Sequence, residues 1–223
     1  MADVKFGLFV PLGWKMDLDQ IDDPVEQFEA MTAVGKLADT QTQFDSIWVY
    51  DHLHTVPTPE IETTFECWTI SATLARDTER VKIGQMVGCN GYRNPALYAK
   101  IASTVDVASH GRLFAGIGAP AGTSRNGAPT ATSGTHTPIR MAKFREAAEI
   151  IHKMWRDEKT SFKGSTTPST APSTSRRSRT PAAEAPGSAA AVNRSRSSSS
   201  PASRMPATSA AAWPTRSPTS SRS

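Results

Sequence analysis

The sequence predicts an α/β fold built around a parallel β-sheet. Short apolar runs at 4–10, 46–50, 81–87 and 113–117 alternate with segments of helical periodicity, as in βαβ units. The runs are apolar at successive positions, which indicates strands buried on both faces. A polar or Gly-rich segment follows most of these runs. Two architectures fit, an open doubly wound sheet or a (β/α)8 barrel, and both place ligands at the carboxyl ends of the strands.

The first βα unit begins with VKFGLFV at 4–10, a short buried strand ended by Pro11. Asp23 and Pro24 then predict a helix start, because an acid caps the first amide groups and proline suits the first turn. Helical spacing predicts a buried stripe made of Val25, Phe28, Met31, Gly35 and Ala38, widened by Val34 and Leu37. The second strand is SIWVY at 46–50.

The remaining units follow the same order. A helix is predicted at 66–75 and a strand at 81–87. Asn94 and Pro95 start a further helix that runs to about Ser109 and stops at Gly111. The fourth strand is 113–117, and a last helix covers 139–155. Tryptophans in these patterns are predicted to be core residues, namely Trp48, Trp68 and Trp155, whereas Trp14 lines a pocket or packs at its rim.

The composition changes at Ser165. Residues 165–223 contain no Ile, Leu, Phe, Tyr or Lys, and they hold eight Arg and one acid, Glu184. Such a segment cannot bury enough apolar surface to offset its ordering entropy, so we expect a disordered Ser/Arg/Pro/Ala-rich tail after a folded region at 1–164. The folded region keeps 17 basic and 20 acidic residues. This balance predicts no specific nucleic-acid surface, although the tail arginines could bind nucleic acid nonspecifically.

The two cysteines, Cys67 and Cys89, show no metal-site spacing and indicate reduced thiols in a cytoplasmic protein. The first residues lack a signal-peptide pattern. No stretch approaches the roughly 18 apolar residues of a membrane span. We therefore expect a protein that binds neither metal nor membrane.

Four segments carry a family resemblance: GLFVPLGW, FDSIWVYDHLHT, the run from ETTFECW to SHGRL, and KFREAAEIIHKMW. Together they make the chain similar to the luciferase-like monooxygenases, and more narrowly to actinobacterial oxidoreductases that use the deazaflavin coenzyme F420. The match covers about residues 4–118 and 137–164. It implies the N-terminal half of a (β/α)8 TIM barrel, hydride transfer between F420 and a small-molecule organic substrate, and the homodimers often found in this family.

Two alternatives remain beside that interpretation. The first is an FMN-dependent luciferase-like monooxygenase that uses molecular oxygen. The second belongs to another class, a non-catalytic interaction protein with a basic tail.

Residues 119–136 and 165–223 depart from the family pattern in a way that a reading-frame slip would produce. If each codon is read from the third base of the present codon, the bases that encode PAGTSRNGAPTAT can instead encode GWYEPEWRAYGY. That sequence resembles the family. Ser codons beginning TC become Val, Leu, Ile or Phe codons under this rule, so a Ser-rich tail is what a hydrophobic segment becomes when misread. We expect a frame-shifted second half and impaired activity. The alternative is a genuine Ser/Arg tail.

His52 is the candidate catalytic residue, with Asp51 as its polar neighbour, just past the second strand. The resemblance implies that His52 faces the cofactor and moves a proton beside hydride transfer. Histidine is the side chain best suited to acid–base work near neutral pH. Without the resemblance, a single histidine in this place is more often structural. His54 points the other way if the loop is extended, and is expected to make a loop contact.

The candidate cofactor-binding residues end the third strand. They are Gln85, Met86, Val87, Gly88 and Asn90. The resemblance implies an irregular backbone here, a bulge or a non-prolyl cis peptide, that supports the deazaflavin ring. Gly88 suits close approach of a ligand to the backbone, although an ordinary loop glycine would look the same. Asn94 is expected to cap a helix.

Overall fold

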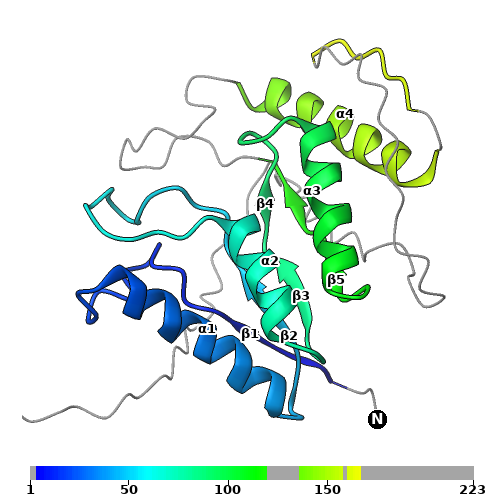
Figure 1. Ribbon diagram of the computed structural model, residues 1–223. Coiled ribbons are helices and arrows are strands. Elements are labelled where there is room, and N and C mark those ends of the chain that lie inside the picture. The colour runs from blue at the N-terminus through cyan, green and yellow to red at the C-terminus, as the bar shows by residue number, and fades with distance from the viewer. Residues whose placement is uncertain (1–3, 120–135, 158–159, 167–223) are drawn as a thin grey trace, which may run out of the picture. The chain divides into compact units, whose positions relative to one another are not determined.

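A parallel sheet of four strands lies at the centre of the computed structural model (Figure 1), which describes residues 4–119, 136–157 and 160–166. The sheet has the order β1-β2-β3-β5. Its strands are β1 (Phe6–Phe9), β2 (Phe44–Val49), β3 (Lys82–Gln85) and β5 (Leu113–Phe114). The helices are α1 (Pro24–Thr40), α2 (Cys67–Asp77), α3 (Pro95–Ala108) and α4 (Thr137–Arg156). The predicted α/β fold with a parallel sheet is confirmed.

A second, short parallel ladder pairs β4 (Gly88–Cys89) with β6 (Ile117–Gly118). A strand lies within each of the predicted ranges 81–87 and 113–117, but the predicted bounds are wrong, because β3 ends at Gln85 and β5 ends at Phe114 before β6 begins at Ile117. The peptide bond between Met86 and Val87 is cis, and the Gly116 amide donates to the Phe114 carbonyl at 3.0 Å instead of to β3. Apolar patterning does not report such a change of backbone path.

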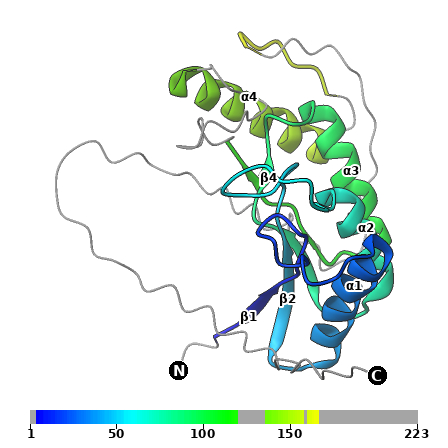
Figure 2. The ribbon, with the colours of Figure 1, turned by 90° about the vertical axis from the view of Figure 1, so that its left-hand side faces the viewer.

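The helices lie on one side of the sheet, and the strand order follows the chain (Figure 2). Each helix packs against the next, α1 on α2, α2 on α3 and α3 on α4. In a doubly wound sheet the strand order reverses and helices cover both faces. The described residues instead wind in one direction only.

The two faces of the sheet carry different side chains. The register row Leu8, Ile47, Ile83 and Leu113 faces the helices and is largely buried in the core. The next row is Phe9, Trp48, Gly84 and Phe114, on the opposite face. The aromatic face is the name used below for the rings gathered there and just beyond the strand ends: Phe9, Trp14, Trp48, Tyr50, His52 and Phe114.

Trp48 lies flat across the aromatic face. A Cβ at Gly84 would come within 2.4 Å of its ring and one at Gly7 within 2.3 Å, so both positions need glycine. The indole donates to Ser46 Oγ at 2.9 Å. Trp68 is buried as predicted, whereas Trp48 and Trp155 are only partly buried and are not full core residues.

The predicted helix starts are confirmed, but the predicted stripe of α1 is partly wrong. Asp23 caps α1 by accepting from the amides of Val25 and Glu26, and Asn94 caps α3. Val25 and Leu37 are 67% and 61% exposed. Gln27 is buried instead, because its amide group donates to the carbonyls of Leu18 and Ile21.

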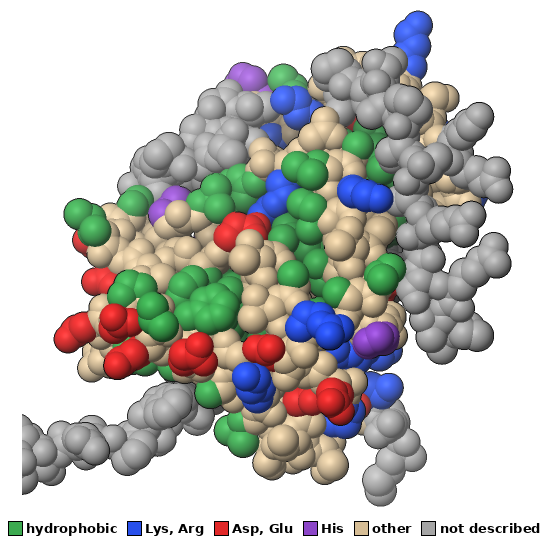
Figure 3. Space-filling model, viewed as in Figure 1, with side chains coloured by type: hydrophobic (Ala, Val, Ile, Leu, Met, Phe, Trp, Pro, Cys, Tyr) green, Lys and Arg blue, Asp and Glu red, His purple; other side chains and the backbone are tan. Residues whose placement is uncertain are grey.

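Acidic side chains gather over α1 on the face seen in Figure 3. Lys and Arg are interspersed with acids over the rest of that face. No helix in the described part of the chain has the length and apolar character needed to cross a membrane. The predictions made for 120–135 and for the tail from Thr167 onward lie outside the described residues.

Candidate active site

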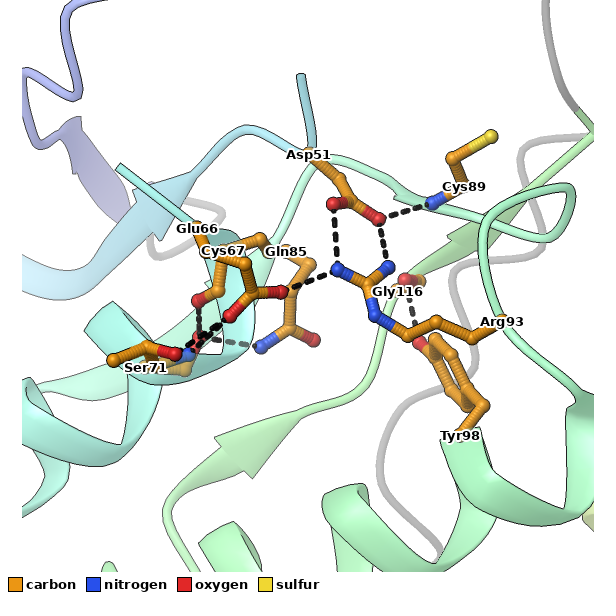
Figure 4. Close-up of polar contacts among 10 residues, drawn as sticks. Asp51, Glu66, Cys67, Ser71, Gln85, Cys89, Arg93, Tyr98 and Gly116 are labelled. Carbon is orange, nitrogen blue, oxygen red and sulfur yellow. Dashed lines mark hydrogen bonds and ion pairs between the residues drawn. The ribbon is translucent and has the colours of Figure 1, made fainter. Parts of the chain in front are cut away.

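The segments that follow β2 and β3 lie side by side at the carboxyl end of the sheet (Figure 4). The Met86 amide donates to the Val49 carbonyl at 2.9 Å. Further along, the Cys89 amide donates to Asp51 Oδ2 at 2.7 Å. These bonds bring together the two predicted groups of site residues, the Asp51–His52 pair and the segment 85–90.

Arg93 joins three elements through one guanidinium. It binds both carboxylate oxygens of Asp51, with Nη2 to Oδ1 at 2.9 Å, and it also contacts Glu66 (Figure 4). Asp51, Arg93 and Glu66 side chains are 0%, 11% and 41% exposed. Burial opposes the charge of Arg93, but the hydrogen bonds and charges of both acids hold its pKa above the ordinary value. The planar fork of arginine suits this two-oxygen contact.

Glu66 performs two tasks in this cluster. It caps α2 by accepting from the Thr69 amide at 2.7 Å and from the Thr69 hydroxyl at 2.8 Å. Partial burial would raise the pKa of Glu66, but the bonds from Thr69 and Arg93 outweigh it and lower the pKa. The cluster therefore links the start of α2 to the loop before α3.

Arg93 was not predicted as a site residue from the sequence, and it is the main partner of Asp51, which was predicted only as the polar neighbour of His52. The Asp51 carboxylate is bound by Arg93 and by the Cys89 amide, so it holds the segment around Cys89 in place. The positions of two acids in the sequence could have indicated Arg93 as their partner. Asp51 and Glu66 both stand at ends of elements that meet at one edge of the sheet, and buried acids need a cation. Arg93 is the basic residue of the neighbouring loop.

His52 is half-buried and stacks on Trp14. The ring centroids are 4.1 Å apart and the planes differ by 14°. Burial is the main cause that lowers the pKa of His52 below 6.5, His54 and Lys15 add to it, and Asp51 opposes it. The imidazole is therefore neutral at pH 7 and able to accept a proton.

His54 makes the predicted loop contact, with Nδ1 2.8 Å from the Thr55 carbonyl oxygen. Within the described ranges no group of three His, Cys, Asp or Glu side chains is arranged to hold a metal ion.

The segment 85–90 presents mostly backbone and one apolar side chain. The expected irregular backbone is present as the cis Met86–Val87 bond. Met86 is 46% exposed. The amides of Gly88 and Asn90 pair with Gly116 and Gly118, at 2.8 and 3.0 Å.

Gln85 faces away from this surface. Its side chain is buried under α2 and donates to Ser71 Oγ at 2.9 Å. Its Oε1 atom has no hydrogen-bond partner in the described part of the chain. Any contact of Gln85 with a cofactor would therefore come from its backbone.

The residues at this end suit the ring of a flavin-like cofactor. A flat ring needs an apolar wall and polar groups at its edge. Met86 and the aromatic face offer the wall, and His52 offers a polar group at its edge. The amides of Met86, Gly88 and Asn90 are bonded to other backbone groups, which holds the segment in place beneath a ring. The guanidinium of Arg93 is already bound by two acids, which leaves it poorly placed to bind a cofactor phosphate.

The family model of the luciferase-like monooxygenases matches residues 4–199. The chain belongs to this family. The matched range includes the segments 119–136 and 165–199.

Two named groups of relatives are similar to the luciferase-like chain. An F420-dependent glucose-6-phosphate dehydrogenase of Kineococcus radiotolerans is 32% identical over 62% of this chain and 41% of its own length. A phthiodiolone/phenolphthiodiolone dimycocerosates ketoreductase of Mycobacterium kansasii is 32% identical over 53% of this chain and 36% of its own length. The chain thus spans about two fifths of these curated relatives.

Solved structures share the fold at low sequence identity. An F420-dependent secondary alcohol dehydrogenase, solved with an F420–acetone adduct, aligns with a TM-score of 0.55 at 23% identity, over 72% of this chain and 45% of that one. The FMN complex of the oxygenating constituent of a Pseudomonas putida diketocamphane monooxygenase aligns with a TM-score of 0.56 at 21% identity, over 75% and 44%. At this identity the likeness shows the fold alone.

Proposed function

We propose that this chain is the N-terminal half of a (β/α)8 barrel oxidoreductase that transfers a hydride between coenzyme F420 and an organic substrate. The sequential strand order with helices on one face supports the barrel, because a barrel winds in one direction while a doubly wound sheet does not. In such a barrel the aromatic face would be the interior, with the site at its carboxyl end.

The observation that carries the function is the bond from the Cys89 amide to Asp51, which brings the segment that carries His52 beside the segment 86–90 at that end. When bound, F420 would supply the hydride acceptor or donor. Met86, Val87 and the backbone to Asn90 would hold its ring, and His52 would stand beside the reacting carbon. The F420-dependent relatives support this cofactor.

His52 would handle the proton of the reaction. In the direction of substrate oxidation, the substrate carbon loses a hydride and its hydroxyl loses a proton, which a neutral imidazole can accept. In the reverse direction the same nitrogen returns the proton to a carbonyl oxygen. The lowered pKa of His52 keeps the imidazole neutral and ready as a base at pH 7. The dehydrogenase and ketoreductase names of the relatives fit an alcohol–carbonyl pair as the substrate class.

The test uses a frame-repaired version, in which residues 119–136 and 165–223 are encoded in the alternative frame. It compares His52→Asn with His54→Asn, a matched control two residues away in the same loop. Loss of general acid–base assistance typically costs about 10²–10⁴-fold in turnover. We expect that loss in His52→Asn, with little change in cofactor affinity, and near-normal turnover in His54→Asn. Equal turnover in the two variants would contradict the role of His52.

A second test compares the affinity for F420 of the present chain with that of the frame-repaired version, in which residues 119–136 and 165–223 are encoded in the alternative frame. We expect the present chain to bind F420 at least ~100-fold more weakly than the repaired version, about 2.7 kcal/mol, because phosphate-binding backbone groups belong to the missing elements. Cofactor fluorescence measures both affinities. Equal affinities would mean that the tail is not a misread barrel half or that this half makes the site alone.

A second candidate is an FMN-dependent monooxygenase that uses oxygen, since an FMN complex aligns as well as the F420 enzyme does. Absorbance separates the two, because flavin and deazaflavin absorb at different wavelengths. Saturable binding of FMN with none of F420 would favour this candidate.

A further inference from the structure

Trp14 covers one face of His52. The rings are nearly parallel, 14° apart, with centroids separated by 4.1 Å. Offset-stacked aromatic rings are favourable by about 0.5–1.5 kcal/mol in proteins. In a parallel stack the imidazole nitrogens point along the ring plane and away from the indole. The contact therefore restrains the ring while leaving its nitrogens at the edge.

The backbone holds Trp14 in that place. The Val56 amide donates to the Trp14 carbonyl at 2.7 Å, which ties the Trp14 turn to the loop that carries His52. Gly13, just before it, has φ of 89°, and a Cβ there would lie 1.9 Å from the Thr63 carbonyl oxygen. Only glycine fits, so the turn is seated tightly against residue 63.

Neighbouring rings restrict the indole from another direction. Tyr50 lies 4.6 Å from Trp14 at a tilt of 53°, and Phe9 stacks on Tyr50 at 4.5 Å. Trp14 Nε1 is buried and has no hydrogen-bond partner in the described part of the chain. The indole therefore acts here through its face and not through its N–H group.

We propose that Trp14 is a positioning residue for His52, whose indole face sets the plane of the imidazole and so directs a ring nitrogen at the substrate oxygen. The inference rests on the proposed function of His52 in proton transfer. Trp14 acts through His52, so the prediction concerns the orientation and titration of that ring.

The charges around His52 allow the effect to be given a sign. Asp51, His54 and Lys15 are the charged or titratable groups that act on the imidazole, and Tyr50 contacts Trp14 on the other side of the stack. Lys15 places its ammonium 5.0 Å from the Trp14 ring centroid. Burial is the main cause of the lowered pKa of His52. Removing the indole uncovers the imidazole, so its pKa should rise toward 6.5 in Trp14→Ala.

The experiment is an NMR pH titration of the histidine rings in the full chain. In the wild-type chain the His52 carbon-bound ring protons should appear upfield of those of His54, because the indole ring current shields them. Trp14→Ala should lose this upfield shift and raise the pKa of His52. Trp14→Phe should keep both, since a ring remains and no hydrogen bond is lost. His54, which contacts Thr55, should titrate alike in all three proteins.

Turnover supplies the readout that a merely structural role would not move. In Trp14→Ala the acidic limb of the pH profile should move to higher pH, and Trp14→Phe should restore it. An unshielded His52 in the wild-type chain, or an unchanged titration in Trp14→Ala, overturns the inference. The first of these needs no variant, so the inference stays testable if Trp14→Ala does not fold. A titration of the frame-repaired chain with F420 is read separately. Absence of binding to that chain overturns the proposed function, whereas binding with unshielded His52 overturns only the role of Trp14.

Discussion

The two ends of the sheet contain similar charged groups that are used differently. At the amino end, Asp39 accepts from the amides of Glu79, Arg80 and Val81, each at 2.8 Å. Arg112 donates there to the carbonyls of four residues, Ala75, Thr78, Val81 and Ser109. At the carboxyl end, Arg93 binds two side-chain carboxylates instead, those of Asp51 and Glu66.

Both clusters stabilise the fold, and they differ in the side chains that they leave exposed beside them. Bonds to backbone groups at the amino end join the turns between helices and strands and use most donors of Arg112 and both oxygens of Asp39. At the carboxyl end the charged cluster holds two segments that leave Met86 and His52 partly exposed. In barrels of this kind the active site lies at the carboxyl end, whereas the amino end serves stability. The proposed function therefore belongs to the residues beside the Arg93 cluster, His52 and the segment 86–90.

Arg93→Met should have the largest effect on stability. It leaves the fully buried Asp51 carboxylate without its cation, and breaking a buried ion pair in this way costs roughly 3–5 kcal/mol. Urea denaturation measures the free energy of unfolding. Asp51→Asn combined with Arg93→Met should recover part of the loss, because the fully buried charge is then removed and the Glu66 carboxylate that stays unpaired is 41% exposed. A loss below about 1 kcal/mol would mean that Asp51 is not buried as described.

Arg112→Met should destabilise the chain by a somewhat smaller amount, about 3 kcal/mol. Several carbonyl groups would lose a charged donor, and each costs about 1–3 kcal/mol when it stays buried and unpaired, less where water can replace the donor. Arg112→Lys should recover only part, since an ammonium cannot reach the same set of carbonyls. The His52 titration should be unchanged in both variants. A shifted His52 titration would show that the two ends are coupled and would break the comparison.

Asp39→Asn should have the smallest effect and should be visible mainly through pH. Partial burial would raise the pKa of Asp39, but the bonds from the amides of residues 79–81 and the charge of Arg112 outweigh it and lower this pKa below 3.8. A carboxyl group whose pKa is lower in the folded state stabilises the fold at pH values above its unfolded-state pKa. That stability is lost as the pH falls through the folded-state pKa. Wild type should lose stability below about pH 4, and Asp39→Asn should lose less over the same range. Parallel curves would contradict the role of Asp39.

Local features of the fold could be predicted from the sequence, and long-range ones could not. Asp23 with Pro24 and Asn94 with Pro95 mark helix starts because capping chemistry is local. The interruption of the strands at Met86–Val87 could not be predicted from apolar patterning. The partners of Arg93 lie 42 and 27 residues away in the chain, so their contact exists only once the strands are paired.

The candidate site shows the same division. His52 could be picked out by residue type and by resemblance, but the stacking of Trp14 on it depends on the positive φ of Gly13 and on a bond from Val56. The stripe of α1 was misplaced because the buried Gln27 reads as a surface residue in any hydrophobic pattern. Tertiary hydrogen bonds decided both positions.

The most direct test of the central claim is to map F420 binding by amide chemical shifts in the full-length chain. At millimolar cofactor, amides of residues 49–52 and 86–90 should shift in a saturable way, and those of 39–41, 78–82 and 109–112 should stay in place. That result would place the cofactor at the carboxyl end, beside His52 and Met86. Chemical-shift changes confined to the amino end, or no changes at millimolar cofactor, would contradict the proposal that the function belongs to the carboxyl end of this sheet.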